Sequence, residues 1–423
     1  MIFTLLATAS AGFTQPVRIT FAYWPDTGEA EVVEEWVAAF NRQNPDIHVE
    51  ILVRSGFAEQ AERVQVEFAA NVAPDVVMAA EPNAWIKAGI LMPLDDFIAR
   101  EPEVISALNP STLKEWQLEL RDDGVLALGR GHYYALPFND FAVIVAYNRQ
   151  LFREAGLDEP DDEAWTYDEF TEIGRRLVKD TDGDGNNEVW GLNWHHQSPN
   201  TTGALALAYG SNYPPIVLEP RVDTDVDSPE FRAALEVQRR WMFEDRIVPP
   251  YGVSIPSFGL NSHGMTVVHN ASILDFIHGY PELDFDLARM PSGPAGKYAR
   301  VFTQAIGITS STPHPEAAWR FVKYLVSEAV ALDMAERLVS MPSHREGVIA
   351  FMDQLPLERK RVFPDTFLHD GYIYLEPIPY QRSILDMLRN PGLNPVWEGT
   401  QTVEAATEEV ARLIRSALSE ALR

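Results

Sequence analysis

Residues 17–53 read VRITFAYWPDTGEAEVVEEWVAAFNRQNPDIHVEILV, and this stretch decides the fold class. It opens with an apolar and aromatic run, Val17–Trp24, that is typical of a buried strand. Apolar side chains then recur at the spacing of one helix face, at Val32, Val33, Trp36, Val37 and Phe40. A second strand pattern follows at Ile47–Val53. A helix between two such strands indicates that the strands pair in parallel.

The same alternation continues beyond residue 53. Another helical pattern carries Phe57, Ala61, Val64 and Phe68, and residues 75–79 form a third, short apolar strand pattern. The sequence therefore predicts an α/β fold with a parallel sheet. In such sheets ligands bind at the carboxyl ends of the strands, which directs attention to Trp24 and to residues 81–83.

Length and charge limit the class of protein. The chain has 423 residues, more than a single hydrophobic core usually serves, so we expect two lobes. Its formal net charge is −28, and a protein that binds a polyanion needs a basic surface. We therefore expect neither nucleic acid nor an anionic membrane as a partner, and we interpret the charge as an aid to solubility.

The first fifteen residues, MIFTLLATASAGFTQ, resemble the end of an export signal, with Ala9-Ser10-Ala11 placed like a signal-peptidase site. The basic region that precedes such a signal is missing here, so a start codon further upstream or an ordinary disordered terminus are the alternatives. The sequence contains no cysteine, which excludes disulfides, thiolate metal sites and the lipidated cysteine of a lipoprotein. We predict a secreted protein in the periplasm or outside the cell.

A second unit begins near Leu136-Pro137. Thr166 and Glu169 form a capping-box pattern ahead of a helix, and Ser228-Pro229 opens another. Strand patterns return around residues 264–270, and residues 402–422 form an amphipathic helix pattern.

Common catalytic motifs are absent from the sequence. It contains no G-x-S-x-G elbow, H-E-x-x-H helix, dinucleotide-binding glycine fingerprint or Walker A loop. The adjacent pairs Asp95-Asp96, Asp122-Asp123 and Asp161-Asp162 lie in turn-like segments, where helix capping and solvation are their ordinary roles. The sequence therefore offers none of these catalytic signatures.

One acidic loop has the pattern of a calcium site. Asp180, Asp182 and Asp184 place carboxylates at alternate positions around a glycine-containing turn, and Glu188 follows four residues later. The carboxylate that an EF-hand carries at its twelfth position is replaced by Gly191. A structural calcium ion and a metal-free loop stabilised by its own side chains both remain open, and no other cofactor is expected.

Short motifs in a fixed order carry a family resemblance over nearly the whole chain. They are Ala39-Phe40-Asn41, Asn44-Pro45-Asp46-Ile47, Ala73-Pro74-Asp75-Val76, Tyr134-Ala135-Leu136-Pro137, Ala146-Tyr147-Asn148-Arg149, Trp165-Thr166-Tyr167-Asp168-Glu169-Phe170, Trp190-Gly191 and His314-Pro315-Glu316-Ala317-Ala318-Trp319. With these motifs the chain resembles the family 1 extracellular solute-binding proteins of bacterial ABC importers, which include maltose-binding and other sugar-binding proteins.

The resemblance implies a periplasmic-binding-protein-like fold, in which two α/β lobes are joined by a hinge and hold the ligand in the cleft between them. We expect residues 16–138 and 269–327 in an N-terminal lobe, and residues 139–268 and 328–423 in a C-terminal lobe. The crossings then lie near residues 139–142, 265–268 and 327–331.

The family's ligand-contacting loops also supply candidate site residues. They are Trp24, Glu81, Asn139, Asp140, Trp194, His269, Asn270, Gln304, Arg345 and Tyr380. Aromatic rings among them offer flat faces for a sugar ring, and the planar polar groups offer paired hydrogen bonds to hydroxyls. At residues 269–271 this chain has His-Asn-Ala where many relatives resemble glycine–x–tryptophan, which leaves the stacking platform undefined.

The resemblance implies two partners for a monomeric protein: a small solute, which we expect to be a mono- or oligosaccharide, and the transmembrane subunits of an ABC permease. Another solute such as a phosphorylated polyol is an alternative within the same class. An extracellular glycoside hydrolase or lyase, which would need two carboxylates facing one cleft, is an alternative of another class.

Overall fold

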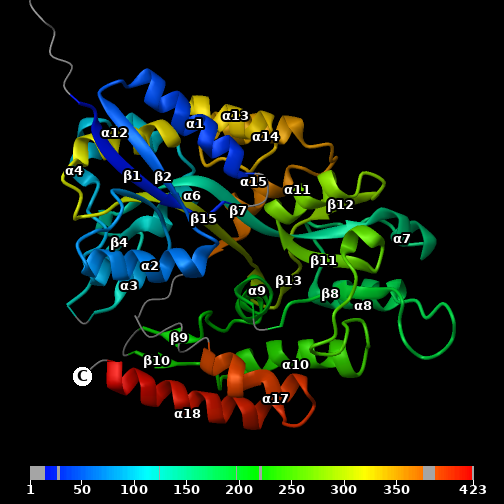
Figure 1. Ribbon diagram of the computed structural model, residues 1–423. Coiled ribbons are helices and arrows are strands. Elements are labelled where there is room, and N and C mark those ends of the chain that lie inside the picture. The colour runs from blue at the N-terminus through cyan, green and yellow to red at the C-terminus, as the bar shows by residue number, and fades with distance from the viewer. Residues whose placement is uncertain are drawn as a thin grey trace, which may run out of the picture.

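Two long strands, β7 (Ala135–Asn148) and β15 (Ala299–Ile308), run side by side through the middle of the molecule (Figure 1). The computed structural model describes residues 15–25, 29–122, 124–196, 198–218, 222–374 and 386–421. Every residue of β7 is buried, because the strand is covered on both faces along its whole length. The two strands connect the two lobes of the molecule.

The N-terminal lobe contains the parallel sheet expected from the opening sequence. Strand β1 (Val17–Tyr23) lies between β2 (Ile47–Val53) and β3 (Val76–Ala79) and pairs in parallel with both. Helices α1 (Glu29–Gln43) and α2 (Phe57–Ala69) are the two crossovers. The predicted order of strands and helices is confirmed, and β15 extends this sheet by pairing antiparallel with β3.

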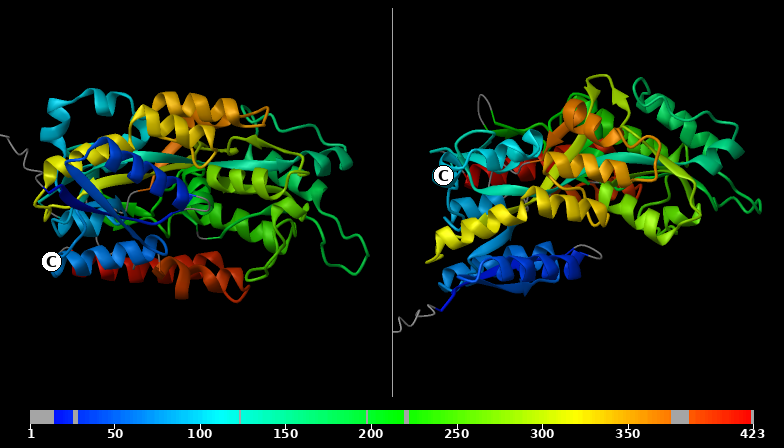
Figure 2. Two further views of the ribbon diagram at one scale, coloured as in Figure 1. Left: turned by 45° about the horizontal axis from the view of Figure 1, so that its top comes forward. Right: turned by 90° about the horizontal axis from the view of Figure 1, so that it is seen from above.

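Helices from the distant part of the chain complete the core of the N-terminal lobe. Helix α12 (Pro315–Leu325) packs against α1, with the rings of Phe40 and Phe321 5.1 Å apart. Helix α13 (Glu328–Glu336) adds Val330 and Met334 to the same core. In Figure 2 the yellow α12 lies beside the blue α1 in both views.

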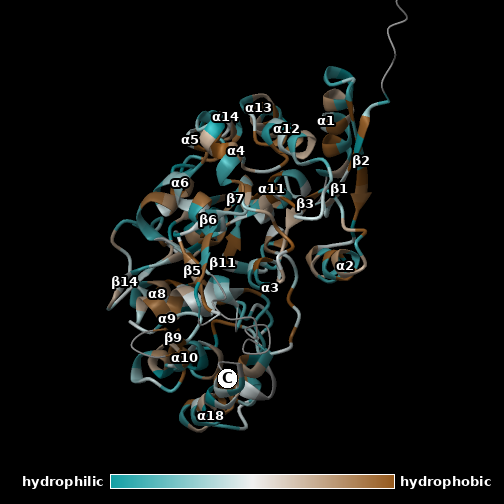
Figure 3. Ribbon diagram, turned by 90° about the vertical axis from the view of Figure 1, so that its left-hand side faces the viewer, coloured by the Kyte–Doolittle hydropathy of each residue, from teal (hydrophilic) through white to brown (hydrophobic). Residues whose placement is uncertain are grey.

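The C-terminal lobe has a mixed sheet around the second half of β7. Strands β11 (His263–His269) and β12 (Phe285–Ala288) pair antiparallel with β7, and β8 (Trp190–Asn193) pairs in parallel with β11. Helices cover this sheet and bury a core rich in aromatic rings; they include α8 (Tyr167–Leu177), α10 (Pro229–Phe243), α17 (Asn394–Trp397) and α18 (Val403–Ala421). In Figure 3 the helices carry both brown and teal residues, as amphipathic helices do.

The predicted helix starts in this lobe are confirmed. Thr166 accepts a hydrogen bond from the Glu169 N–H, and the Glu169 side chain accepts one from the Thr166 N–H, which completes the capping box of α8. Ser228 caps α10 by accepting from the Phe231 N–H.

The predicted boundaries between the lobes differ from the structure. Strand β7 changes partners between Ala142, which pairs with β15, and Val143, which pairs with β11. Strand β11 does not cross between the lobes, because it pairs with β7 and β8 over its whole length. Helix α11 (Asn270–Gly279) and β12 pack with the second half of β7, although residues 269–327 were expected in the N-terminal lobe.

The residues after 327 also divide differently than expected. Helix α13 packs on the N-terminal lobe and also adds Ala335 to a third apolar cluster beside the crossing strands, to which α14 (Arg345–Gln354) and α15 (Val362–Asp365) contribute as well. Sequence patterns locate helices and strands but do not show which core a helix joins, so the exact lobe boundary after β11 stays a prediction.

Shorter elements fill the connections between these layers. They are α3 (Pro82–Lys87), α4 (Asp95–Arg100), α5 (Glu103–Ser106), α6 (Pro110–Leu113), β4 (Gln117–Leu120), β5 (Leu126–Leu128), β6 (His132–Tyr133), α7 (Arg149–Glu154), α9 (Ala204–Ala208), β9 (Ile216–Val217), β10 (Asp223–Thr224), β13 (Ser292–Gly293), β14 (Gly296–Lys297) and β16 (Gly371–Ile373). Within the described residues, no helix is both long and apolar enough to cross a bilayer. Residues 1–14 of the predicted export signal lie outside the described residues.

Candidate functional site

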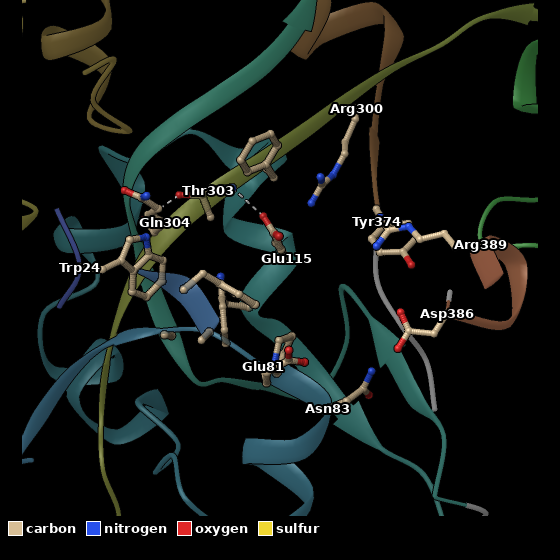
Figure 4. Close-up of a pocket in the computed structure, with 16 residues that line it drawn as sticks. Trp24, Glu81, Asn83, Glu115, Arg300, Thr303, Gln304, Tyr374, Asp386 and Arg389 are labelled. Atoms are coloured by element: carbon tan, nitrogen blue, oxygen red, sulfur yellow. Dashed lines mark hydrogen bonds between the residues drawn. The ribbon is translucent and has the colours of Figure 1, made fainter. Parts of the chain in front are cut away.

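A cavity of about 570 Å³ lies where the two lobes meet (Figure 4). Its lining comes from both lobes and from β15 between them, namely Trp24, Phe57, Ala79, Ala80, Glu81, Pro82, Asn83, Glu115, Trp116, Arg300, Phe302, Thr303, Gln304, Tyr374, Asp386 and Arg389. This volume falls within the range of small-molecule sites.

The carboxyl ends of two parallel strands form one wall of the cavity. Trp24 follows β1 directly, and residues 80–83 follow β3 and lead into α3. These strands are neighbours in the sheet, so their ends meet at one edge. The sequence predicted a ligand site at this edge, and the structure places the cavity there.

Aromatic rings line the cavity on two sides. The rings of Trp24 and Phe57 meet edge to face with their centroids 5.7 Å apart. On β15, Phe302 stacks on Phe141 at a centroid distance of 4.7 Å. These contacts fix Trp24 and Phe302, so their exposed surfaces are rigid apolar walls for a ligand.

Arg300 lies on the cavity wall, carries a positive charge and contacts both Phe302 and Tyr374. Its guanidinium carbon lies 4.4 Å from the ring centroid of Phe302 and 5.5 Å from that of Tyr374. Its Nη1 donates a hydrogen bond of 3.1 Å to Oδ1 of Asn200, which lies in the π-helical turn Pro199–Gly203 of the C-terminal lobe. A residue of a crossing strand therefore contacts the C-terminal lobe while it faces the cavity.

Several buried polar atoms at the cavity wall have no hydrogen-bond partner among the described residues. They are Oδ1 of Asn83, Nε1 of Trp116 and Nε of Arg300. Buried polar groups are nearly always paired, so unpaired ones around one cavity point to a polar ligand or ordered water.

Glu115 is a cavity residue with a strongly altered acidity. Burial raises the pKa of this carboxyl to about 8, against the opposing effects of Arg300 and of a hydrogen bond from the Thr303 N–H to Oε2 at 2.8 Å. The carboxyl group is therefore largely protonated and neutral at pH 7.

Three of the ten predicted site residues line the cavity: Trp24, Glu81 and Gln304. Direct contact of these residues with a solute stays a prediction. Tyr380 lies outside the described residues.

Asn139 and Asp140 are buried in β7 and do not line the cavity. The Asp140 carboxylate accepts hydrogen bonds from Nδ2 of Asn109 at 2.7 Å and from Oγ of Ser343 at 2.5 Å. Asn139 donates from Nδ2 to Oγ of Ser340 at 3.0 Å. Both residues therefore fasten the crossing strand to neighbouring loops.

His269 and Asn270 also lie beside the crossing strands and not on the cavity wall. Asn270 accepts from the Ala142 N–H at 3.1 Å and donates to the Asp140 carbonyl at 3.0 Å, so its amide fixes β7 where it changes partners. The ring of His269 meets Phe302 edge to face at 6.0 Å. His269 therefore packs against Phe302, a residue of the cavity wall.

Trp194 and Arg345 were expected to face the solute, and the structure places both elsewhere. Trp194 is buried in the core of the C-terminal lobe, where Nε1 donates to Oε1 of Gln238 at 2.9 Å. Arg345 is exposed at the start of α14, and its Nη2 donates to the Ser106 carbonyl at 2.9 Å. We therefore assign Trp194 a packing role and Arg345 a role in joining α14 to α5.

Glu115, Trp116, Arg300 and Phe302 were missed by sequence reasoning. Glu115 and Trp116 lie on a single 3-10 turn, Lys114–Trp116, which has no periodic pattern. In the structure, buried and half-buried residues alternate along Ala299–Gln304, which places Arg300 and Phe302 on one face of β15. This face becomes a cavity wall because the opposite lobe lies across from it, and the sequence pattern of β15 does not show that arrangement.

The acidic loop brings its four predicted metal ligands together. One carboxylate oxygen from each of Asp180, Asp182, Asp184 and Glu188 lies within 4.8 Å of the others, and all four side chains are exposed. The loop also uses these groups internally, since Asp180 accepts from the Gly183 and Gly185 N–H groups at 2.7 and 2.9 Å. Oxygen ligands in this arrangement suit calcium, and binding of the ion stays a prediction.

Two α/β lobes, joined by crossing strands and enclosing a partly apolar cavity with a few polar groups, define a two-lobed ligand-binding protein. The sequence profile of the bacterial extracellular solute-binding protein family matches residues 24–332. The chain belongs to this family, so its function is to bind a solute and not to catalyse a reaction.

Two curated relatives have low sequence identity to this chain but align over most of its length. The maltotriose-binding protein of Pyrococcus abyssi is 23% identical over 411 residues, covering 91% of this chain and 75% of that protein. The mannitol-binding protein of Pseudomonas aeruginosa is 25% identical over 312 residues, covering 69% of this chain and 65% of that protein.

Solved structures match the fold over almost the full length. An ABC substrate-binding protein from Listeria monocytogenes in complex with cycloalternan has a TM-score of 0.80 at 20% identity, with 96% of this chain and 99% of that chain covered. The maltose/maltodextrin-binding domain from Bdellovibrio bacteriovorus bound to maltotriose has a TM-score of 0.74 at 20% identity, with 95% and 100% covered. These matches confirm the predicted periplasmic-binding-protein-like fold.

Proposed function

We propose that this protein captures a neutral mono- or oligosaccharide outside the cytoplasmic membrane and delivers it, as a monomer, to the permease of an ABC importer. The observation that carries the proposal is the cavity, which combines the aromatic ring of Trp24 and the guanidinium of Arg300, lying over the Phe302 ring, with further polar groups such as Gln304. Sugar rings present flat CH faces and pairs of hydroxyls, which suit aromatic stacking and bidentate hydrogen bonds. Relatives named for maltotriose and arabinooligosaccharides support the same ligand class, and the relative named for mannitol, a neutral polyol, supports a neutral polyhydroxylated solute.

The position of the cavity supports capture by domain closure. A solute that contacts Trp24 in the N-terminal lobe and Arg300 on the crossing strand also approaches Tyr374 and Arg389 on the other side. Closure is favoured only to the extent that the solute binds the closed form more tightly than the open one. Contacts from both sides provide that difference.

A thermal-shift screen tests the proposal. The panel contains maltose, maltotriose, arabinooligosaccharides, mannitol, phosphorylated polyols, amino acids and polyamines. A solute that binds only the folded protein stabilises it by about 2.7 kcal/mol at a hundredfold excess over its dissociation constant, which raises the melting temperature measurably. We expect stabilisation by at least one neutral sugar, confirmed by titration calorimetry. Stabilisation by amino acids or polyamines alone would contradict the proposal.

A phosphorylated polyol is the second candidate. Two arginines, Arg300 and Arg389, line the cavity, and Glu115 carries little negative charge to oppose an anion at neutral pH. Stabilisation by polyol phosphates and not by the corresponding free polyols would favour this candidate over a neutral sugar.

A further inference from the structure

Glu115 lies on the cavity wall and is hydrogen-bonded to β15. Its 3-10 turn, Lys114–Trp116, holds the carboxyl group beside β15, and Oε2 accepts the Thr303 N–H at 2.8 Å. Among the described residues the other oxygen, Oε1, has no hydrogen-bond partner. Figure 4 shows the Glu115 carboxyl group between Thr303 and the open part of the cavity, with Arg300 on the same side. One oxygen is therefore fixed by the protein, and the other is available to a solute.

Charged groups around Glu115 act in opposite directions. Arg300 on β15 favours the carboxylate, and Asp140 on β7 disfavours it. The guanidinium of Arg300 is engaged by Asn200 and by the ring of Phe302, and among the described residues Arg300 acts on Glu115 through its charge without a hydrogen bond between them. The remaining charged groups on the cavity wall are Glu81, Asp386 and Arg389.

Burial has a larger effect on Glu115 than these charges have. It raises the pKa of the carboxyl group to about 8 in the solute-free protein. A bound sugar would displace water from the cavity, and loss of water disfavours the charged form further. The pKa of Glu115 should therefore be higher in the complex than in the free protein.

We propose that Glu115 is a specificity-determining residue that binds the solute as a neutral carboxylic acid, donating its proton in a hydrogen bond to an acceptor oxygen of the sugar. This inference rests on the proposed function and adds that capture is coupled to a proton. The neutral acid offers a donor where a carboxylate would offer only acceptors, so this position selects for a ring, glycosidic or carbonyl oxygen of the solute, or for a hydroxyl acting as acceptor.

The pH dependence of affinity tests the coupling. Dissociation constants are measured between pH 6 and 9.5 by titration calorimetry, using maltotriose first and then whichever panel sugar stabilises the protein most. Because binding requires the protonated form, affinity should be constant below about pH 7 and about tenfold weaker at pH 9. Calorimetry at pH 9 in two buffers with different ionisation enthalpies should show uptake of nearly one proton per sugar.

Two variants separate Glu115 from other groups that titrate. Glu115→Gln keeps a neutral side chain with a donor, so it should bind the sugar with an affinity independent of pH and more tightly than the native protein at pH 9. Glu119→Gln, an exposed change four residues away outside the cavity, should keep the native affinity and the native pH profile. Proton uptake by the native protein is a readout that does not depend on how either variant folds.

The outcomes distinguish this inference from the proposed function. Sugar binding that is unchanged between pH 6 and 9.5, or that strengthens above pH 8, overturns the inference and leaves the proposed function standing. A pH dependence that persists in Glu115→Gln also overturns it. A protein that binds no sugar at any pH overturns the proposed function and the inference together.

Discussion

Replacing Trp194 by alanine should destabilise the protein without weakening sugar binding. The side chain is 3% exposed, its ring centroid lies 4.9 Å from that of Trp241, and its indole N–H donates to Gln238 at 2.9 Å. Trp194 is not one of the residues that line the cavity. The substitution therefore tests whether the structure places this tryptophan correctly, since its family position predicts contact with the solute.

The expected size follows from these contacts. Removing a buried tryptophan leaves a cavity in the core, and such changes lower the free energy of unfolding by about 3–5 kcal/mol. The lost hydrogen bond leaves Gln238 Oε1 with its second donor, Oγ1 of Thr202 at 3.0 Å, so it adds little further cost. A loss of this size is a large share of the 5–15 kcal/mol that typically separates folded from unfolded domains.

Calorimetric melting and sugar titration of the same preparation check this prediction. We expect the transition to move to lower temperature, while the dissociation constant at 20 °C stays within about twofold because the cavity is intact. Trp36→Ala is the matched control: Trp36 is another buried tryptophan outside the cavity, and its Nε1 bonds to Asp333 at 2.7 Å. A Trp194→Ala protein that melts normally but binds sugar ten times more weakly would refute our placement of Trp194 in the core.

Three further predictions concern the cavity, the acidic loop and pH. Trp24→Ala should weaken sugar binding by roughly 1–3 kcal/mol, about ten- to hundredfold, through loss of a stacking face, and an unchanged affinity in calorimetry would remove Trp24 from the site. Calcium should raise the melting temperature by binding at the loop of Asp180–Glu188, and a chelator should reverse this rise while the sugar affinity stays unchanged. The double variant Asp180→Asn/Asp184→Asn should show no rise with calcium. A chelator that has no effect on the melting temperature of the native protein would contradict calcium binding. Glu115 has a pKa raised from 4.5 to about 8, so the stability it contributes is greatest below pH 4.5 and is lost as the pH rises to 8. In urea unfolding, Glu115→Gln should therefore gain stability relative to the native protein between pH 5 and 8, and a constant difference between them over that range would count against the raised pKa.

Local elements were predictable because each leaves a pattern in adjacent residues. The strand β1, the helix α1 and the capping box at Thr166 and Glu169 depend on neighbours within a few positions. The carboxyl ends of β1 and β3 could also be identified, and they supply Trp24 and Glu81 to the cavity. These residues come from one lobe and one sheet edge.

The rest of the site depends on contacts between distant segments. Arg300, Phe302 and Gln304 reach the cavity because β15 pairs with β3 on one side and β7 on the other. Glu115 becomes a neutral acid only through burial in the tertiary structure. Trp194 is a tryptophan, a residue type that could stack on a sugar ring. Only its burial and its hydrogen bond to Gln238 show that it belongs to a core.

The pairing of β3 with β15 also affects the order in which the protein can fold during synthesis. Ala79 pairs with Ala305, so more than 200 residues must be made before the edge of β3 is covered. At about 5–20 residues per second, a ribosome needs roughly 10 to 45 seconds for that length. During this time the edge of β3 lacks its final neighbour, and α12 is still missing from the core. A chain cut after residue 138 therefore cannot complete the N-terminal lobe, and stable folding of the protein waits for its last third.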